Sequence, residues 1–277
     1  MKTILSILLI FFAVSVQAQK SCCSATAEFA SLGKTSGFSA SHQEPTNIID
    51  QDLRGEWVEF ETPGGGEAGR AYAVSTENPG NDYLFIFHEW WGLNLHIRSE
   101  ADRLASELPG VNVLAIDLYD GKETTTRESA AALMESAEES RIRNIIRGAI
   151  NFAGDDAEIA TLGWCFGGGW SMQAAIMAGD QAVACVVYYG MPEQSPEKLA
   201  QLEAPVLGIF AENDGWINRE AVGKYERAMD EAGKKYESVW YDADHAFANP
   251  SNSIYDDNAA DNANKKAIQF LHQRLVK

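Results

Sequence analysis

From Tyr83 onward, the chain alternates short apolar segments with longer segments of helical periodicity. Apolar residues at nearly every position are typical of parallel strands buried on both faces, and parallel strands need helical crossovers between them. Strands are predicted at 83–87, 111–116, 159–163, 183–188, 205–210 and 237–241. Helices are predicted at 95–108, 127–153 (as two helices), 168–178, 219–232 and 257–275. This order predicts an α/β fold with a mostly parallel central sheet and helices on both faces.

Two further strands are expected before this region. Residues 57–60 and 71–74 are strand-like, and Pro63-Gly64-Gly65-Gly66 between them is typical of a hairpin turn. The glycine run does not fit a phosphate-binding loop, since no Lys-Ser or Lys-Thr pair follows it. With no internal repeat and no second core, the sequence predicts one domain over residues 56–277, preceded by an irregular extension over 19–55.

The first eighteen residues have the features of a secretory signal peptide. Lys2 gives a positive start, residues 4–16 form an apolar run, and Val16-Gln17-Ala18 offers small residues at the cleavage positions. A membrane anchor is the alternative, but this run of 13 residues is too short, because a spanning helix needs about 20. We therefore expect residues 1–18 to be removed, the protein to be exported to a periplasm or to the medium, and no membrane association afterwards.

The charge balance excludes one class of partner. The 277 residues include 22 Lys and Arg against 40 Asp and Glu, a net charge of −18. So acidic a chain repels polyanions at long range, and no nucleic-acid partner is expected. A chain of this length can stabilise itself by its core, so its four cysteines need not form a disulfide framework. The pairing of the adjacent Cys22 and Cys23 stays open.

The segment Gly163-Trp164-Cys165-Phe166-Gly167 follows a predicted strand and precedes a predicted helix. This is the context of a nucleophile elbow, G-x-S-x-G, with cysteine at the serine position. The two glycines avoid clashes in a strained turn, and the helix dipole favours a thiolate at Cys165. Cys165 is therefore predicted to be a nucleophile, with a buried structural cysteine as the alternative. Cys185, inside an apolar strand, is expected to have that structural role.

Two later loops offer the partners that a nucleophile needs. Asp214 and His245 each follow a predicted strand, and the order nucleophile, acid, histidine is the one that this kind of sheet uses. His245 is predicted to relay the thiol proton, and Asp214 to orient the imidazole and stabilise its charged form. Asp242 and Asp244 are alternatives, although neighbours within one loop seldom reach behind the ring.

Glu89 follows the strand at 83–87 and is predicted to present a carboxylate to the thiol. The backbone N–H groups of Trp90 and Phe166 are candidates for an oxyanion hole. The segment from His88 lacks the second histidine of an H-E-x-x-H zinc helix, because position 92 is Gly, so no metal site is predicted. The candidate substrate-pocket residues are Trp91, Trp164, Tyr189 and Asn249.

Together these motifs resemble those of the dienelactone hydrolase family, which has the α/β-hydrolase fold. The matching segments are Glu89 to Gly92, Asp117-Leu118-Tyr119, Gly163 to Gly168, Tyr188-Tyr189-Gly190 and Asp244-His245-Ala246-Phe247. The resemblance covers residues 56–275. It implies a cysteine hydrolase with the triad Cys165, Asp214 and His245, in which Glu89 helps to deprotonate the thiol. It also implies that the enzyme needs no metal or organic cofactor.

One position departs from the family pattern. Where the archetype has an arginine that helps to bind the carboxylate of a dienelactone, this chain has Asn249, and Arg127 is only a loose candidate for a second such arginine. We therefore expect a modest-sized ester or lactone as the substrate, cleaved outside the cytoplasm. The alternatives are a broad carboxylesterase or acyltransferase, and a secreted binding protein without turnover whose Cys22-Cys23 extension pairs with or covers Cys165. The sequence does not predict the oligomeric state.

Overall fold

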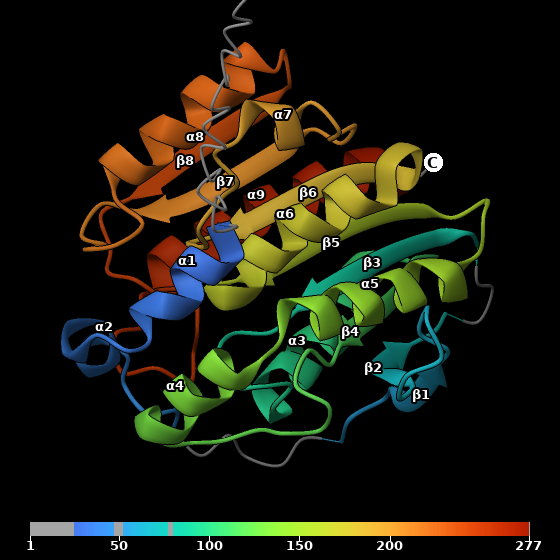
Figure 1. Cartoon of the computed structure of the whole chain (residues 1–277), viewed down its shortest axis with the longest axis horizontal. Helices are drawn as coiled ribbons and strands as arrows, with labels where there is room; N and C mark the ends of the chain where they lie inside the picture. The colour runs from blue at the N-terminus through green and yellow to red at the C-terminus, as the bar shows by residue number, and fades with distance from the viewer. Residues whose placement is uncertain (1–24, 47–51, 77–79, 277) are drawn as a thin grey trace, which may run out of the picture.

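The structure is a computed structural model that describes residues 25–46, 52–76 and 80–276 (Figure 1). The predicted signal peptide, residues 1–18, and the pair Cys22 and Cys23 lie outside the described residues.

One sheet of eight strands forms the centre of the molecule. The strands are β1 (Glu56–Phe60), β2 (Gly69–Val74), β3 (Asp82–Phe87), β4 (Asn112–Ile116), β5 (Glu158–Trp164), β6 (Ala182–Tyr188), β7 (Val206–Ala211) and β8 (Tyr236–Tyr241). Their order in the sheet is β1-β2-β4-β3-β5-β6-β7-β8. β3 to β8 are parallel to one another, whereas β1 pairs antiparallel with β2, and β2 antiparallel with β4. The predicted hairpin and the mostly parallel α/β sheet are confirmed.

Helices cover both faces of this sheet. The helices after β3 are α3 (Leu95–Glu107), α4 (Arg127–Ser136), α5 (Glu139–Ala153), α6 (Phe166–Ala178), α7 (Pro196–Leu199), α8 (Arg219–Glu231) and α9 (Asp257–Leu275). In Figure 1, α5 and α6 lie in front of the sheet, and α3 and α9 lie behind it. The predicted helices match these bounds closely, and the four-residue α7, begun by the N-cap Ser195 and by Pro196, is an addition.

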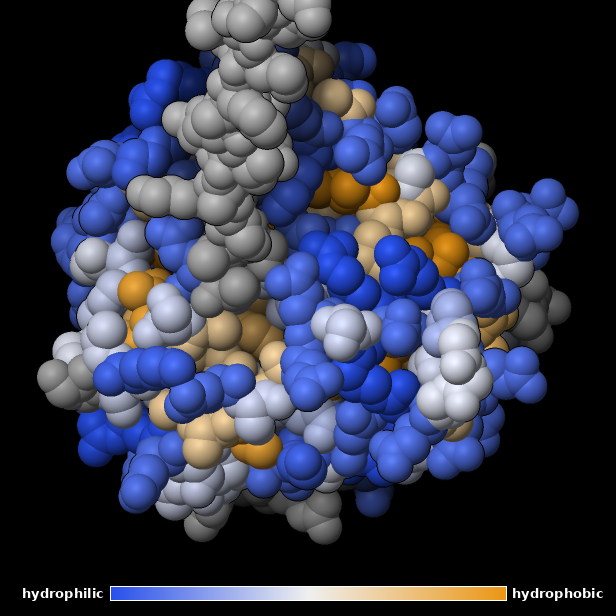
Figure 2. Space-filling model, viewed as in Figure 1, coloured by the Kyte–Doolittle hydropathy of each residue, from blue (hydrophilic) through white to orange (hydrophobic). Residues whose placement is uncertain are grey.

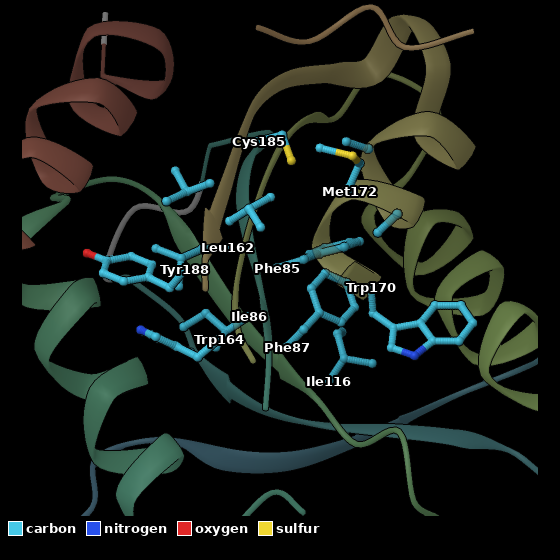
Figure 3. Packing of buried hydrophobic residues seen from close by; sticks show 14 of the residues in the cluster. Phe85, Ile86, Phe87, Ile116, Leu162, Trp164, Trp170, Met172, Cys185 and Tyr188 are labelled. Carbon is cyan, nitrogen blue, oxygen red and sulfur yellow. The ribbon is translucent and has the colours of Figure 1, made fainter. Parts of the chain in front are cut away.

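The strand pattern explains why both faces are buried. Figure 3 shows Phe85 and Phe87 on the side of Trp170, while Ile86 points to the other side with Tyr188. Successive side chains of a strand point to opposite faces, so a strand between two helical layers must be apolar at every position. The four residues from Leu84 to Phe87 are fully buried. This central strand therefore anchors the two layers to each other.

The extension before β1 differs from the prediction. Instead of being irregular throughout, it contains α1 (Ala25–Leu32) and α2 (Ser36–Ser41). The side chain of Thr35 caps α2 by accepting a hydrogen bond from the N–H of Phe38 at 3.3 Å. Helices this short are not stable in isolation. Burial of Phe29 and Phe38 against the rest of the chain provides the free energy that stabilises them. Figure 1 shows α1 lying across the N-terminal end of α6.

The face of the molecule seen in Figure 2 is mostly hydrophilic, with small apolar patches between charged side chains. Within the part of the chain that the structure describes, no helix has both the length and the apolar character that a membrane-spanning segment needs.

Candidate active site

Cys165 occupies a strained turn between β5 and α6. Its backbone has φ 55° and ψ −119°, a conformation that costs free energy for a residue with a side chain. The flanking glycines permit the turn: a Cβ on Gly163 would lie 2.1 Å from the carbonyl oxygen of Gly167, and one on Gly167 would lie 2.2 Å from that of Phe87. The chain thus enters α6 directly after the cysteine, two residues earlier than the sequence predicts. This is the geometry of a nucleophile elbow.

Three side chains meet at the carboxyl edge of the sheet. His245, after β8, places Nε2 3.4 Å from Sγ of Cys165. Its Nδ1 lies 2.5 Å from Oδ2 of Asp214, in the loop after β7. The other carboxylate oxygen of Asp214 accepts the N–H groups of Trp216 and Ile217 at 2.8 and 2.9 Å. The carboxylate is therefore held in place behind the imidazole, where it fixes the tautomer with the proton on Nδ1.

The charges of this group support one another. Burial opposes ionisation of Asp214, but His245 and the two backbone N–H groups outweigh it and lower the pKa of the carboxyl. Burial also opposes a charge on His245, but Asp214 and the sulfur of Cys165 outweigh it and raise the pKa of the imidazole well above its ordinary value. His245 is therefore a stronger base than a free histidine.

The thiol itself is held in its neutral form. Burial raises the pKa of Cys165, and the nearby Glu89 acts in the same direction, while His245 and the backbone N–H of Phe166 oppose them. The side chain is almost completely buried, with 1% of its surface exposed. Formation of the thiolate thus depends on transfer of the proton to a neighbouring base.

Glu89 lies at the end of β3 and is buried. Burial raises the pKa of its carboxyl to about 7, although His245, Asn249 and Tyr189 act in the opposite direction. The side-chain amide of Asn249 donates a hydrogen bond to the Glu89 carboxylate. The amide oxygen of Asn249 accepts both the N–H and the hydroxyl of Ser251, at 2.8 and 2.6 Å. Asn249 is therefore a support for Glu89, and its polar atoms are already engaged.

The remaining predicted residues are all aromatic and buried. Phe166 is the first residue of α6 and directly follows Cys165, and Trp90 follows β3, the strand that pairs with β5. The ring of Tyr189 packs against that of His245 at an angle of 58°, with centroids 5.2 Å apart. Trp164 packs against Tyr188 in the core, and Figure 3 shows both on the side of the sheet away from Trp170. Trp91 is buried beside Trp90.

Arg127, the loose candidate for an anion-binding residue, begins α4. It lines a surface hollow together with Thr35 and Glu44, and Cys165 is not among the residues lining that hollow. His88 has both ring nitrogens in hydrogen bonds with the backbone, to the carbonyl of Glu89 and from the N–H of Leu118, which fits a structural role.

The extension adds one residue that the sequence reasoning missed. His42, at the end of α2, places Nε2 3.9 Å from Sγ of Cys165, and its ring lies 4.8 Å from that of His245. Burial, and next the proximity of His245, lower its pKa to about 3, so His42 is neutral at physiological pH. Phe38 of the same helix packs edge-on against Trp90. No local motif marks His42, because 123 positions of sequence separate it from the cysteine.

A family model, described as the dienelactone hydrolase family, matches residues 70–275. The chain belongs to the dienelactone hydrolase family. Two relatives align with most of this chain. "Protein usf" of Aquifex pyrophilus is 28% identical over 80% of this chain and 100% of its own length. The "Putative carboxymethylenebutenolidase" of Aquifex aeolicus is 27% identical over 80% of this chain and 99% of its own.

Solved structures agree with the family in fold. The dienelactone hydrolase from Anabaena variabilis is similar with a TM-score of 0.59 at 17% identity, over 80% of this chain and 99% of the other. At that identity the likeness shows the α/β-hydrolase fold alone. As a member of the dienelactone hydrolase family, the chain is a hydrolase of ester or lactone bonds.

Proposed function

We propose that this enzyme is exported and cleaves a small ester or lactone through the triad Cys165, His245 and Asp214, with an acyl-enzyme intermediate. The observation that carries the proposal is the continuous series of contacts from Sγ to Nε2 and from Nδ1 to the Asp214 carboxylate, 3.4 and 2.5 Å long, at the start of α6. A buried structural cysteine needs no such series, whereas a nucleophile needs both partners.

The reaction proceeds in two halves. The thiol proton moves to Nε2 of His245 as Sγ bonds to the acyl carbon, and the imidazolium then gives that proton to the leaving alkoxide as its bond to the acyl carbon breaks. Water next attacks the acyl carbon and loses a proton to His245, and the departing thiolate takes that proton back. We expect the N–H of Phe166, at the N-terminus of α6, to stabilise the oxyanion of both tetrahedral states.

Glu89 supplies a second site for the thiol proton. Its carboxyl, with a pKa of about 7, is partly ionised at neutral pH and acts electrostatically on Cys165. When His245 already carries a proton on Nε2, transfer of the thiol proton to the Glu89 carboxylate leaves an ion pair of thiolate and imidazolium, the reactive form of a cysteine nucleophile. The substrate is proposed to be of modest size and, because the polar atoms of Asn249 are engaged with Glu89 and Ser251, not to depend on residue 249 for binding a carboxylate.

The test uses the chain from Gln19 with a panel of chromogenic esters and lactones. Cys165→Ala should abolish turnover, by roughly a thousandfold or more as for other lost nucleophiles. Cys185→Ala is the matched control, since Cys185 is also buried and free but lies inside β6, and it should keep its activity. Intact-mass spectra after rapid acid quench should show one added acyl group on the wild type. Turnover that persists in Cys165→Ala refutes the mechanism.

Export has its own test. The full chain, expressed in a bacterium with an intact secretion machinery, should be recovered outside the cytoplasm with Gln19 as its first residue. A chain that keeps Met1 and stays in the cytoplasmic fraction refutes export without touching the proposed chemistry.

A further inference from the structure

Three ligand atoms of metal-binding type converge above the elbow. They are Sγ of Cys165, Nε2 of His245 and Nε2 of His42, and all lie within 4.8 Å of one another. The sulfur is 3.4 Å from the first nitrogen and 3.9 Å from the second. All three side chains are buried, with at most 4% of their surface exposed. The proposed hydrolytic mechanism uses two of these residues and gives no role to His42.

Both histidines are oriented as metal ligands are. Nδ1 of His42 lies 2.7 Å from the carbonyl oxygen of Phe38, which only accepts, so the proton is on Nδ1 and the lone pair of Nε2 faces the sulfur. Nδ1 of His245 is held in the same way by Asp214. A carbonyl or carboxylate behind each imidazole is the usual outer shell of a protein zinc site, where it fixes the ring and strengthens the ligand.

One of the three distances between the ligand atoms already has the length that a tetrahedral ion requires. With zinc-to-sulfur and zinc-to-nitrogen bonds of about 2.3 and 2.0 Å, neighbouring ligand atoms stand about 3.3–3.6 Å apart. The contact between Cys165 and His245 already has this length, whereas Nε2 of His42, 3.9 Å from the sulfur and within 4.8 Å of Nε2 of His245, would have to move toward both atoms. One thiolate and two imidazoles form a donor set that favours zinc and copper over magnesium or calcium.

We propose that Cys165, His245 and His42 form a binding site for a thiophilic divalent transition-metal ion of the zinc type. Binding converts the thiol to a thiolate and His245 to a neutral imidazole, and it releases the thiol proton and the Nε2 proton of His245 to solvent, so that each imidazole binds through the lone pair of Nε2. A water molecule completes the coordination. The bound ion occupies the nucleophile and ties α2 to the catalytic domain, so the metal-bound enzyme is a closed and inactive form.

Metal binding is tested without reference to turnover, so that its failure is distinct from failure of the proposed hydrolysis. The chain from Gln19 carries Cys22→Ser and Cys23→Ser, which leaves Cys165 and Cys185 as its cysteines. The reduced, metal-free protein is titrated with Co²⁺ and then with Zn²⁺. We expect one Co²⁺ per chain, a thiolate-to-cobalt charge-transfer band in the near ultraviolet, visible bands of tetrahedral cobalt, and loss of all of them as Zn²⁺ replaces cobalt.

The variant His42→Ala separates the three-residue site from a simple cysteine–histidine pair. It should weaken binding by at least about 100-fold, because loss of an outer-shell partner alone costs roughly 10–100-fold. His272→Ala, at an exposed position of α9, should bind as tightly as the parent protein. If His42→Ala does not fold, His42→Gln replaces it, since an amide can still donate to the carbonyl of Phe38. Absence of the charge-transfer band in the parent, or equal affinity in the His42 variant, overturns the proposal.

Discussion

Glu89 and Asp214 are two buried carboxylates that both interact electrostatically with His245, and their surroundings shift their pKa values in opposite directions. Asp214 accepts two backbone N–H groups besides His245, so its ionised form is stabilised despite burial. Glu89 has one amide donor, Asn249, and burial dominates, raising its pKa to about 7. The number of donors that point at each carboxylate decides which one stays charged.

The raised pKa of Glu89 predicts a specific dependence of stability on pH. An unfolded glutamic acid ionises near pH 4.5, whereas folded Glu89 keeps its proton up to about pH 7. Between these values the folded state binds more protons, so the free energy of unfolding must fall as the pH rises. Relative to Glu89→Gln, the wild type should lose about 3 kcal/mol between pH 4.5 and pH 8.

The measurement is urea unfolding of both proteins across this pH range. Cys165, His245 and Tyr189, the other titratable groups that act on Glu89, are present in both chains, so their contributions largely cancel in the difference. If the free energy of unfolding changes with pH equally in the wild type and in Glu89→Gln, the raised pKa of Glu89 is contradicted.

At the scale of elements, the elbow depends on close approach of backbones. A Cβ on Gly167 would lie 2.2 and 2.4 Å from the carbonyl oxygens of Phe87 and His88, which belong to β3 and its end. Backbone atoms in the middle of a sheet cannot move aside, so Gly167→Ala should cost at least about 3 kcal/mol of stability. The matched control is Gly223→Ala in α8, where a Cβ meets only the end of Arg227 at 3.5 Å.

Because alanine favours helix, Gly223→Ala should keep or raise stability by about 0.5–1 kcal/mol. Thermal unfolding of the two variants measures the difference. A Gly167→Ala protein within about 0.5 kcal/mol of the wild type, the range of ordinary surface changes, would show that the elbow is looser than its geometry indicates.

The position of α2 predicts how fast the thiol reacts with reagents from solvent. His42 contacts Cys165, and Phe38 packs on the His42 ring, so we expect the buried thiol to become accessible only when α2 moves away. Phe38→Ala removes contacts with Trp90 and Trp216, and it should speed alkylation of Cys165 by iodoacetamide at least about 10-fold. The reason is that lowering the free energy of local opening by about 1.4 kcal/mol raises the open population tenfold. Peptide mass mapping against time measures the rate.

Two controls accompany this experiment. Phe152→Ala removes a phenylalanine that is 44% exposed and should leave the rate unchanged. Cys185 reports global unfolding, because it is buried in β6 on the side of α6 (Figure 3). If Phe38→Ala speeds alkylation of both cysteines equally, the effect is loss of overall stability and the role of α2 as a cover is refuted.

For the whole molecule, the net charge of −18 predicts a preference among substrates. Negative charge on the protein repels an anionic ester at long range, and salt screens this repulsion, with a Debye length of about 30 Å at 0.01 M and 8 Å at 0.15 M. Raising the ionic strength between these values should increase kcat/KM for an anionic ester by roughly 2- to 10-fold. The same change should leave kcat/KM for a neutral ester of the same size unchanged. An equal increase for both esters would contradict the proposed repulsion.

Much of the architecture was predictable because it depends on local patterns. Apolar runs and helical periods located each strand and the helices from α3 to α9 except α7, since a two-faced sheet requires apolar residues at every position of its strands. The order of Cys165, Asp214 and His245 predicted a convergence, because parallel strands present their carboxyl ends at one edge. The structure does place these three side chains together.

What the tertiary structure alone decided is how that edge is covered. α1 and α2 are too short to be stable by local propensity, and they form because Phe29 and Phe38 are buried against the domain. That packing brings His42 to the thiol, and the sheet separately brings Asn249, after β8, to Glu89, after β3, across 160 positions of sequence. Contacts between residues so far apart in sequence are determined by the summed burial of many side chains, and no local periodicity or motif predicts them.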